Sequence, residues 1–272
     1  MVRSLWSAAT GMVAQQTNID TIANNLANVN TTGYKTEVAN FKSLLYQTLQ
    51  TRTTTANGDQ KPVGAQVGLG VRNSSISSIF SQGAFQDSES TTDFAISGKG
   101  LFAVTGKDGD TYYTRNGNFY LNINDSGGLT LCTAEGYPVL STTGKEITFN
   151  KNYTASNLTV SEEGEFYYPD ANNNPQPLGI KIGLYQFNNP TGLEKLGGSY
   201  YQETEASGEP INESRSTNLE KSTIVQGYLE RSNVQVVDEM VNMIVAQRAY
   251  EMNSKAITTS DEMLQQANNL KR

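Results

Sequence analysis

The chain has 272 residues, of which 20 are basic and 27 acidic, so its net charge at pH 7 is −7. This length allows one large domain or two modest ones with a sizeable core, and the acidic balance argues against nucleic acid and anionic lipid as partners. The absence of histidine removes His-based catalytic triads, most zinc sites and the usual general base near neutral pH.

The first predicted element is an amphipathic helix that starts near Ser4 and ends between Asn28 and Thr32. Two columns of residues seven apart interleave along it, and only Gln15 among them is polar. Four heptads of this a/d pattern predict a helix that packs along another helix and is ordered mainly when docked. A turn-forming run up to Gly33 ends it. The columns are Leu5, Met12, Ile19 and Leu26, and Ala8, Gln15, Ile22 and Val29.

The start of this helix does not read as a secretory signal. Serine and threonine interrupt the short apolar run that follows Arg3, and polar residues resume at Gln15. We therefore predict no Sec-type signal. No stretch approaches the ~20 apolar residues of a membrane span, so no membrane insertion is predicted.

A connector is predicted after this helix. Residues 34–50 carry scattered large apolar side chains and are expected to form either a short helix or an extended segment. Residues 51–70 are polar and contain glycine and proline, so they are predicted to be a long loop or a flexible strand pair that extends from the body.

Residues 71–210 have the pattern of β structure, in which short strand-like runs alternate with turn signals. The turns at Gly98-Lys99-Gly100, Asp108-Gly109, Asn116-Gly117 and Asp125-Ser-Gly-Gly128 predict hairpins. No long helical pattern separates the runs, which favours a β-sandwich or distorted barrel. Cys132 is predicted to be a small apolar strand residue. The predicted strands are 94–97, 101–104, 111–114, 118–121, 129–132, 158–161, 165–168 and 180–187.

A second amphipathic helix is predicted near the C-terminal end, where a capping box of Ser232 and Gln235 precedes Val236. Two columns of residues seven apart again run along it. We therefore predict an α+β fold, in which the N- and C-terminal helices pair in a coiled-coil-like core around an inserted all-β domain. The columns are Val236, Met243, Tyr250, Ile257 and Leu264, and Ala249, Ala256, Met263 and Leu270.

Two readings of the helical columns remain open. The helices either pack only on each other within one copy, or they also contact helices of other copies. Trp6 and Val13 lie seven apart beside the first seam, and the second helix has a similarly wide apolar band. Because each band is wider than one partner needs, contacts with several neighbouring helices are favoured.

Three patterns that resemble chemical sites are better explained as structure. Gly98-Lys99-Gly100 lacks the spacing and the Ser or Thr of a phosphate loop. Glu162, Glu163 and Glu165 surround a turn and favour a solvated hairpin edge over paired catalytic carboxylates. The tyrosines favour packing on strand faces over a carbohydrate surface. No nucleophile, base and orienting group can be named together, so we predict no enzymatic activity, cofactor or metal.

The segment Ala23-Asn-Asn-Leu-Ala-Asn-Val-Asn-Thr-Thr-Gly-Tyr-Lys35 closely resembles the N-terminal signature of bacterial flagellar rod and hook proteins. The resemblance continues through Ser81-Gln-Gly, Ile96-Ser-Gly-Lys-Gly-Leu-Phe, Tyr113-Thr-Arg-Asn-Gly-Asn-Phe, Gln226-Gly-Tyr-Leu-Glu-Arg-Ser-Asn-Val and Val241 to Ile257. The signature residues are Asn24, Asn25, Leu26, Ala27, Asn28, Gly33, Tyr34 and Lys35.

The resemblance implies a non-enzymatic subunit that assembles into a hollow helical tube. Length and the insert around residues 51–70 are most similar to family members that build the distal rod, the rigid shaft that transmits torque from motor to hook. The family implies that both terminal helices line the inner tube. The residues implied in subunit contacts are Leu5, Trp6, Ala8, Met12, Val13, Ile19, Ile22, Leu26 and Val29, and Val236, Met243, Ala249, Tyr250, Ala256, Ile257, Met263 and Leu264.

The implied location is the basal body, in the part of the rod that spans the periplasm, reached through the flagellar type III export channel. The implied partners are further copies of the chain, proximal rod proteins, hook or hook-rod junction proteins, the surrounding P and L ring proteins and the export apparatus. Alternatives are a proximal rod or hook subunit, and a secreted adhesin whose helices form a stalk. The expected domains are residues 1–34, 35–82, 83–216 and 217–272.

Overall fold

The computed structural model describes residues 2–50, 64–107, 109–124, 127–151, 153–170, 174–216 and 219–270. The chain divides into two compact units. The helical unit contains Met1–Ala27, Glu37–Ser78 and Gln235–Arg272, and the β unit contains Asn28–Thr36 and Ile79–Val234. These units cut across the four predicted segments, since residues 28–34 and 217–234 of the two helical segments, and residues 35–36 and 79–82 of the predicted connector, group with the β unit.

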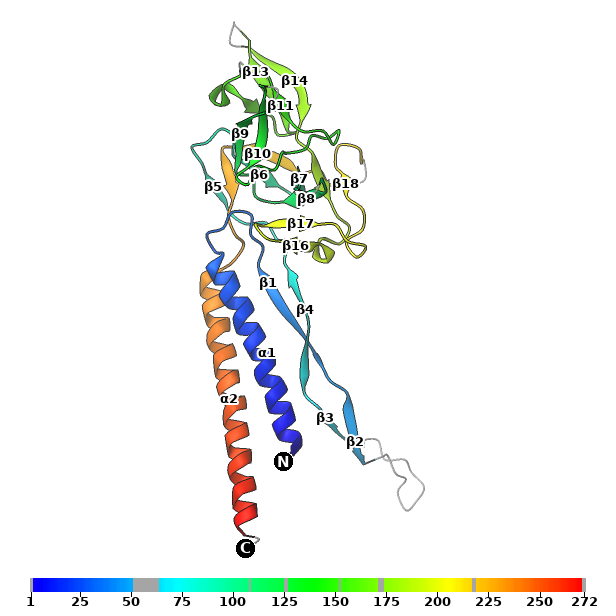
Figure 1. Ribbon diagram of the computed structural model, residues 1–272, viewed down its shortest axis with the longest axis vertical. Coiled ribbons are helices and arrows are strands. Elements are labelled where there is room, and N and C mark those ends of the chain that lie inside the picture. Colours follow the sequence, from blue (N-terminus) through cyan, green and yellow to red (C-terminus); the bar gives the residue numbers. More distant parts are fainter. Residues whose placement is uncertain are drawn as a thin grey trace. The chain divides into compact units, whose positions relative to one another are not determined.

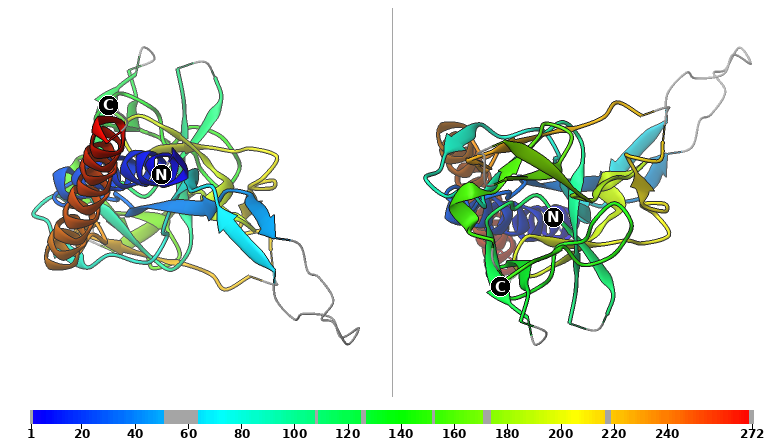
Figure 2. Two further views of the ribbon diagram at one scale, coloured as in Figure 1. Left: turned by 90° about the horizontal axis from the view of Figure 1, so that it is seen from below. Right: turned by 90° about the horizontal axis from the view of Figure 1, so that it is seen from above.

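The helical unit consists of α1 (Val2–Ala27), α2 (Val236–Asn269) and a ribbon of four short strands. The helices pack side by side in opposite directions, with both chain termini at one end of the pair (Figure 1). The ribbon contains β1 (Glu37–Ser43) paired with β4 (Val71–Ser78), and β2 (Tyr46–Gln50) paired with β3 (Ala65–Gly68). α1 contacts both α2 and the β1–β4 pair, so it lies between them (Figures 1 and 2).

The ribbon bears on the predicted connector. Residues 37–43 and 46–50 are extended rather than helical, and β3, within the 51–70 insert, pairs with β2, which directly precedes it. Residues 51–63 of that insert lie outside the described residues. Neither helix of the described chain combines the length and hydrophobicity that crossing a bilayer requires.

α2 does not begin with the predicted capping box. Its N-cap is Gln235, whose side chain makes no capping hydrogen bond. Ser232 instead accepts a hydrogen bond from Val234 N at 3.3 Å, which closes a short turn before the helix. The capping-box prediction was therefore wrong, because the hydroxyl satisfies a backbone donor two residues ahead, before the helix starts.

The β unit packs several small antiparallel sheets around a main apolar cluster and a second, smaller one. Its largest sheet has the strand order β16-β17-β8-β7-β15-β18, and the other sheets have the orders β11-β10-β9, β12-β13-β14, β19-β6 and β20-β5. The strands are β5 (Phe85–Asp87), β6 (Phe94–Ser97), β7 (Leu101–Thr105), β8 (Thr111–Thr114), β9 (Phe119–Ile123), β10 (Leu129–Thr133), β11 (Thr148–Phe149), β12 (Thr159–Val160), β13 (Glu165–Pro169), β14 (Pro175–Lys181), β15 (Leu184–Gln186), β16 (Glu194–Leu196), β17 (Tyr200–Gln202), β18 (Ile211–Asn212), β19 (Thr223–Gln226) and β20 (Tyr228–Glu230).

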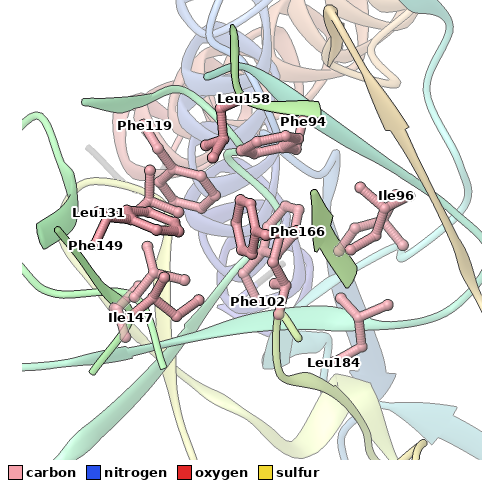
Figure 3. Close-up of a cluster of buried hydrophobic side chains, with 14 of the residues drawn as sticks. Phe94, Ile96, Phe102, Phe119, Leu131, Ile147, Phe149, Leu158, Phe166 and Leu184 are labelled. Carbon is pink, nitrogen blue, oxygen red and sulfur yellow. The ribbon is translucent and has the colours of Figure 1, made fainter. Parts of the chain in front are cut away.

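The core of this unit is built from large side chains of different sheets that point toward one another (Figure 3). Phe94, Phe102, Phe119 and Phe166 are completely buried. Their rings meet edge-on or tilted, and the centroids of Phe102 and Phe119 lie 5.1 Å apart. This is the arrangement that aromatic rings prefer. Cys132 is buried in β10, as predicted, and burial raises the pKa of its thiol.

Two of the four predicted hairpin turns are correct. β7 pairs with β8 and β9 with β10, across turns that contain Gly109 and Gly127. Asp108, Asp125 and Ser126 in these turns lie outside the described residues.

The other two turns carry the chain from one sheet to another. β6 pairs with β19 rather than with β7, so Gly98-Lys99-Gly100 is not a hairpin turn. The backbones at Gly117 and Phe94 approach each other so closely that an added Cβ on Gly117 would lie 1.7 Å from Phe94 O. The predicted strand 180–187 is divided in the same way, between β14 and β15.

Candidate functional site

The signature residues 24–35 form the passage from α1 into the β unit. Asn24 to Ala27 end α1, and Asn28 to Lys35 belong to the β unit. Each half is fixed within its own unit by specific hydrogen bonds.

In the helical unit, Asn25 holds the start of β1. Its Nδ2 donates to Glu37 O and its Oδ1 accepts from Glu37 N, both at 2.8 Å, and the residue is only 1% exposed. The side-chain amide of Asn25 thereby provides the two hydrogen bonds that a neighbouring strand would otherwise make with the backbone N–H and C=O of Glu37. Asparagine suits this place because its side chain carries a donor and an acceptor side by side.

Asn25→Ala should destabilise the helical unit by about 1–3 kcal/mol, because Glu37 N and Glu37 O would each lose the hydrogen bond to the buried Asn25 amide. Urea unfolding followed by the helical circular dichroism signal measures this, and exchange of the Glu37 amide hydrogen should accelerate. The matched control is Asn24→Ala, whose exposed side chain meets Glu37 Oε2 only at 3.5 Å. An equal effect of both variants would contradict the role given to Asn25.

In the β unit, the second half of the signature leads to a buried ionic group, the Lys35 cluster, made of Lys35, Arg115 and Glu230. Lys35 Nζ lies 2.6 Å from Glu230 Oε1 and donates to Ser81 O at 2.7 Å. Arg115 Nε lies 3.5 Å from Glu230 Oε2. The Lys35 and Glu230 side chains are 0% exposed and that of Arg115 is 2% exposed.

Glu230 also holds the backbone around the Lys35 cluster through hydrogen bonds. Gly83 N donates to Glu230 Oε1 at 2.8 Å, and Gly33 N donates to Glu230 O at 2.8 Å. Gly33 has a φ of +69°, and an added Cβ would lie 2.6 Å from Asn116 N. Only glycine combines this conformation with such close approach.

Asn233 joins the same part of the β unit from the C-terminal side of the chain. Its Oδ1 accepts from Thr36 N and Thr36 Oγ1, both at 2.7 Å, and its Nδ2 donates to Ile79 O at 2.9 Å and Ser81 Oγ at 2.8 Å. Segments near residues 35, 81, 115 and 230 thus meet at one point. Each of these segments is one of the motifs noted in the sequence. The sequence alone did not indicate that the motifs lie close together in the fold.

Burial dominates the electrostatics of the Lys35 cluster. Desolvation lowers the pKa of Lys35, Arg115 acts in the same direction, and Glu230 opposes both. Burial also lowers the pKa of Arg115, against the attraction of Glu230 and Glu213. Because both cations depend on Glu230, its removal would leave two positive charges together in a dry site.

The predicted assembly residues of α1 occupy different surroundings. Ala8 and Ile22 are buried, and Leu5, Met12, Ile19 and Leu26 are half-buried. Val29 is half-buried but lies in the β unit, beyond the helix. Trp6 and Val13 are 67% and 66% exposed, which leaves them available to other molecules.

Along α2, the buried and half-buried residues recur every three or four positions, as expected for one face of a helix. This covered face contains only one of the two predicted columns. Met243, Ile257 and Leu264 of the first column are half-buried, whereas Val236 and Tyr250 are 38% and 39% exposed. Of the second column, Ala249 is half-buried, and Ala256, Met263 and Leu270 are exposed. The column that accompanies Met243 on the covered face is Glu239, Ala246, Asn253 and Ser260.

The other predicted chemical patterns have structural roles. Gly164 has φ of +80° in the turn between β12 and β13, and Lys181 pairs with Glu163 at 3.2 Å and Glu165 at 3.7 Å at the surface. Tyr113, Tyr200 and Tyr201 are buried, as packing on strand faces requires. Within the described residues, no group of three Cys, Asp or Glu side chains is placed to hold a metal ion.

Burial raises the pKa of Tyr113 far above its usual value of 10.0. In the unfolded chain the Tyr113 phenol ionises near pH 10, so this residue should lower the stability as the pH rises above 10, by about 1.4 kcal/mol at pH 11. Tyr113→Phe should remove this loss, as measured by urea unfolding at pH 9 and pH 11. Tyr120→Phe, at a 54% exposed position of β9, is the control and should behave as the unmodified chain. Equal pH dependence of all three proteins would refute the prediction.

Family models match three stretches of the chain. Residues 5–35 match "Flagella basal body rod protein", residues 95–168 match "Flagellar hook protein FlgE/F/G D1 domain", and residues 225–270 match "Flagellar basal body rod FlgEFG protein C-terminal". The first and third models together contain most of α1, the signature, the segment of Glu230 and Asn233, and α2. The middle model lies within the β unit.

Whole-chain relatives agree with these matches. The flagellar basal-body rod protein FlgG of Borreliella burgdorferi is 46% identical over 274 residues, with 100% of both chains covered. The FlgG of Buchnera aphidicola subsp. Schizaphis graminum is 43% identical, with 99% of this chain and 100% of the relative covered. The FlgG of Bacillus subtilis is 40% identical over 272 residues, with 100% of both chains covered.

Proposed function

Because the chain belongs to the family of flagellar basal-body rod proteins, we propose that it is a structural subunit of the distal rod, the shaft between motor and hook. The observation that carries this proposal is the 46% identity to a FlgG protein over the full length of both chains. The protein is not an enzyme. As a rod subunit it assembles with copies of itself and adjoins other components of the flagellar basal body.

The mechanical role follows from repetition. Each copy contributes apolar helix surface and a β unit with its own core, and many weak contacts repeated along a helical polymer add up to resistance against twisting. We infer that the terminal helices of different copies pack in a coiled-coil-like manner along the inner wall of a hollow tube. The exposed side chains of Trp6, Val13 and Met263 support this inference.

Specific neighbours are proposed from the family. These are proximal rod proteins at one end, hook or hook-rod junction proteins at the other, the P and L rings around the tube, and the type III export apparatus that delivers the chain. For the residue roles, we propose that the assembly residues named from the sequence make the contacts between copies.

Assembly of the purified full-length chain tests the proposed function. At rising concentration it should form tubes of constant diameter, visible by electron microscopy and recovered by ultracentrifugation. The secreted adhesin would be supported instead if the chain stayed monomeric at every concentration and its β unit bound to glycans on an array.

We further propose that the insert around residues 51–70 stiffens the tube. The two described strands at the base of the insert, β2 and β3, form an antiparallel pair. This pairing fixes the two ends of the insert, which supports a stiffening role. Deleting residues 51–64 should leave tubes that form but bend more, as measured by the persistence length in electron micrographs. An unchanged persistence length would refute the stiffening role.

A further inference from the structure

An apolar groove of about 610 Å³ runs along α1 in the helical unit. An α-helix turns by about 100° per residue, so Trp6, Ala9 and Val13 in the groove wall point about 140–160° away from Gly11 around the helix axis. Gly11 faces Asn253 of α2. The groove therefore lies on the side of α1 that its own α2 does not cover. Its lining is Leu5, Trp6, Ala9, Thr10, Val13, Ala14, Leu44, Val71, Arg72 and Asn73.

α2 has an apolar stripe on the face opposite to its covered side. Val237, Val241 and Ile244 lie about 140–180° around the helix from the buried Ala246. The exposed fractions of these three side chains are 73%, 54% and 56%. An exposed apolar stripe on a helix is typical of a surface that another element covers. The stripe consists of Val237, Met240, Val241, Ile244, Val245 and Met252.

Groove and stripe lie at different heights along the helix pair. Gly11 is level with Asn253, and the helices run in opposite directions. At 1.5 Å per residue, the middle of the stripe lies about 15 Å from the middle of the groove along the axis. One copy therefore cannot bury its own stripe in its own groove, because the two surfaces differ in both height and side.

We propose that the groove of one copy receives the α2 stripe of a second copy, displaced by about 15 Å along the helix axis. This pairing rests on the proposed function of self-assembly and specifies its contact. It joins two different surfaces, so each added copy leaves one groove and one stripe open. Because the displacement has a component along the axis, the contact produces an open helix rather than a closed ring.

The chemistry of the two surfaces is complementary. Both are mainly apolar, so their contact removes apolar area from water. The exposed Arg72 lies in the groove wall, and the exposed Asp238 flanks the first part of the stripe, so these two side chains have opposite charges. Arg248 and Glu251 also lie on this face of α2, between Val245 and Met252, where they pair with each other at 2.8 Å. Opposite charges across a contact fix its register more than they strengthen it.

Cross-linking between two populations of full-length chains tests the pairing. One population carries Val13→Cys and the other Ile244→Cys, both with Cys132→Ala, so that any heterodimer must join different copies. After co-assembly and treatment with a short bifunctional maleimide, the heterodimer should form in the tubes. The matched control replaces Ile244→Cys with Lys255→Cys, which lies on the same far face of α2 about 16 Å further along.

The outcomes separate the pairing from the proposed function. Tubes without the Val13–Ile244 product, or with as much Val13–Lys255 product, would overturn the pairing while leaving self-assembly intact. Failure of the unmodified chain to form tubes would overturn the proposed function itself.

A charge-compensation pair covers the case in which the cysteine variants do not assemble. Val13→Lys and Ile244→Glu alone should each lower the yield of tubes by at least about tenfold, because an unpaired charge would be buried in the contact. The two together in one chain should restore most of the yield, whereas Val13→Lys with Lys255→Glu should not. Absence of rescue by the first combination would also overturn the pairing.

Discussion

Lys35→Met should lower the free energy of unfolding of the β unit by about 3–5 kcal/mol, the usual cost of removing one partner from a buried ion pair. Methionine keeps much of the length of the lysine side chain, so the main loss is the charge. Arg115, whose Nε lies 3.5 Å from Oε2 of Glu230, would be the one cation left beside this carboxylate, which would also keep its hydrogen bond from Gly83 N. Ser81 O would lose the ammonium donor at 2.7 Å.

Urea unfolding followed by tyrosine fluorescence measures this change, because most tyrosines of the described chain lie in the β unit. Lys181→Met provides the matched control. Lys181 pairs with Glu163 at 3.2 Å, but the two side chains are 34% and 81% exposed, so its removal should cost less than about 1 kcal/mol. If Lys35→Met costs no more than Lys181→Met, the Lys35 cluster does not stabilise the β unit.

A double-mutant cycle separates the pair from its surroundings. Glu230→Gln keeps an acceptor for Gly83 N but removes the charge that holds both cations. Lys35→Met and Glu230→Gln should therefore be strongly non-additive, with a coupling of about 1–3 kcal/mol. Additive effects would indicate that each residue acts through other contacts.

The strands of the β unit were predictable from local sequence, whereas their partners were not. The apolar runs at residues 94–97 and 101–104 are strands, because β-branched and aromatic residues between turn signals favour extended structure. The glycines between them look the same whether the chain folds back or moves to another sheet. The pairing of β6 with β19 depends on a segment near the far end of the chain, which local patterns do not encode.

The same limit applies to the Lys35 cluster. Its three residues are far apart in sequence, and each is unremarkable in a chain with 20 basic and 27 acidic residues. The available signal was that Lys35, Arg115 and Glu230 each stand inside a motif quoted for the family resemblance. Motif membership identifies such residues but does not indicate that they touch.

The helices show the opposite error. Hydrophobic spacing identified both of them and one seam of α2, but it selected Ala249, Ala256 and Met263 as the second seam. The covered column contains Glu239, Ala246 and Ser260, which are small or polar. An added Cβ on Gly11 would lie 2.8 Å from Asn253 Nδ2, so the helices approach closely there. Close approach selects small side chains, and apolar periodicity overlooks them.

Ile22→Asp should abolish tube formation while leaving the β unit folded. Ile22 is only 5% exposed in the helical unit, so an aspartate there would place a charge at a buried apolar position. The expected cost is several kcal/mol, from lost apolar burial together with desolvation of a charge. The β unit has its own core around Phe102 and Phe119, which this substitution does not reach.

The measurement combines pelleting of tubes with near-ultraviolet circular dichroism, which reports the packed aromatic rings of the β unit. Ile22→Val should cost only about 0.5–1.5 kcal/mol and should still give tubes. Ala23→Asp places the same charge at the adjacent exposed position and should leave the helical signal of the monomer nearly intact. If Ile22→Asp still pellets as tubes, packing of α1 is not required for assembly. If its aromatic signal collapses, the two units do not fold independently, and loss of assembly would then say nothing about the helix seam.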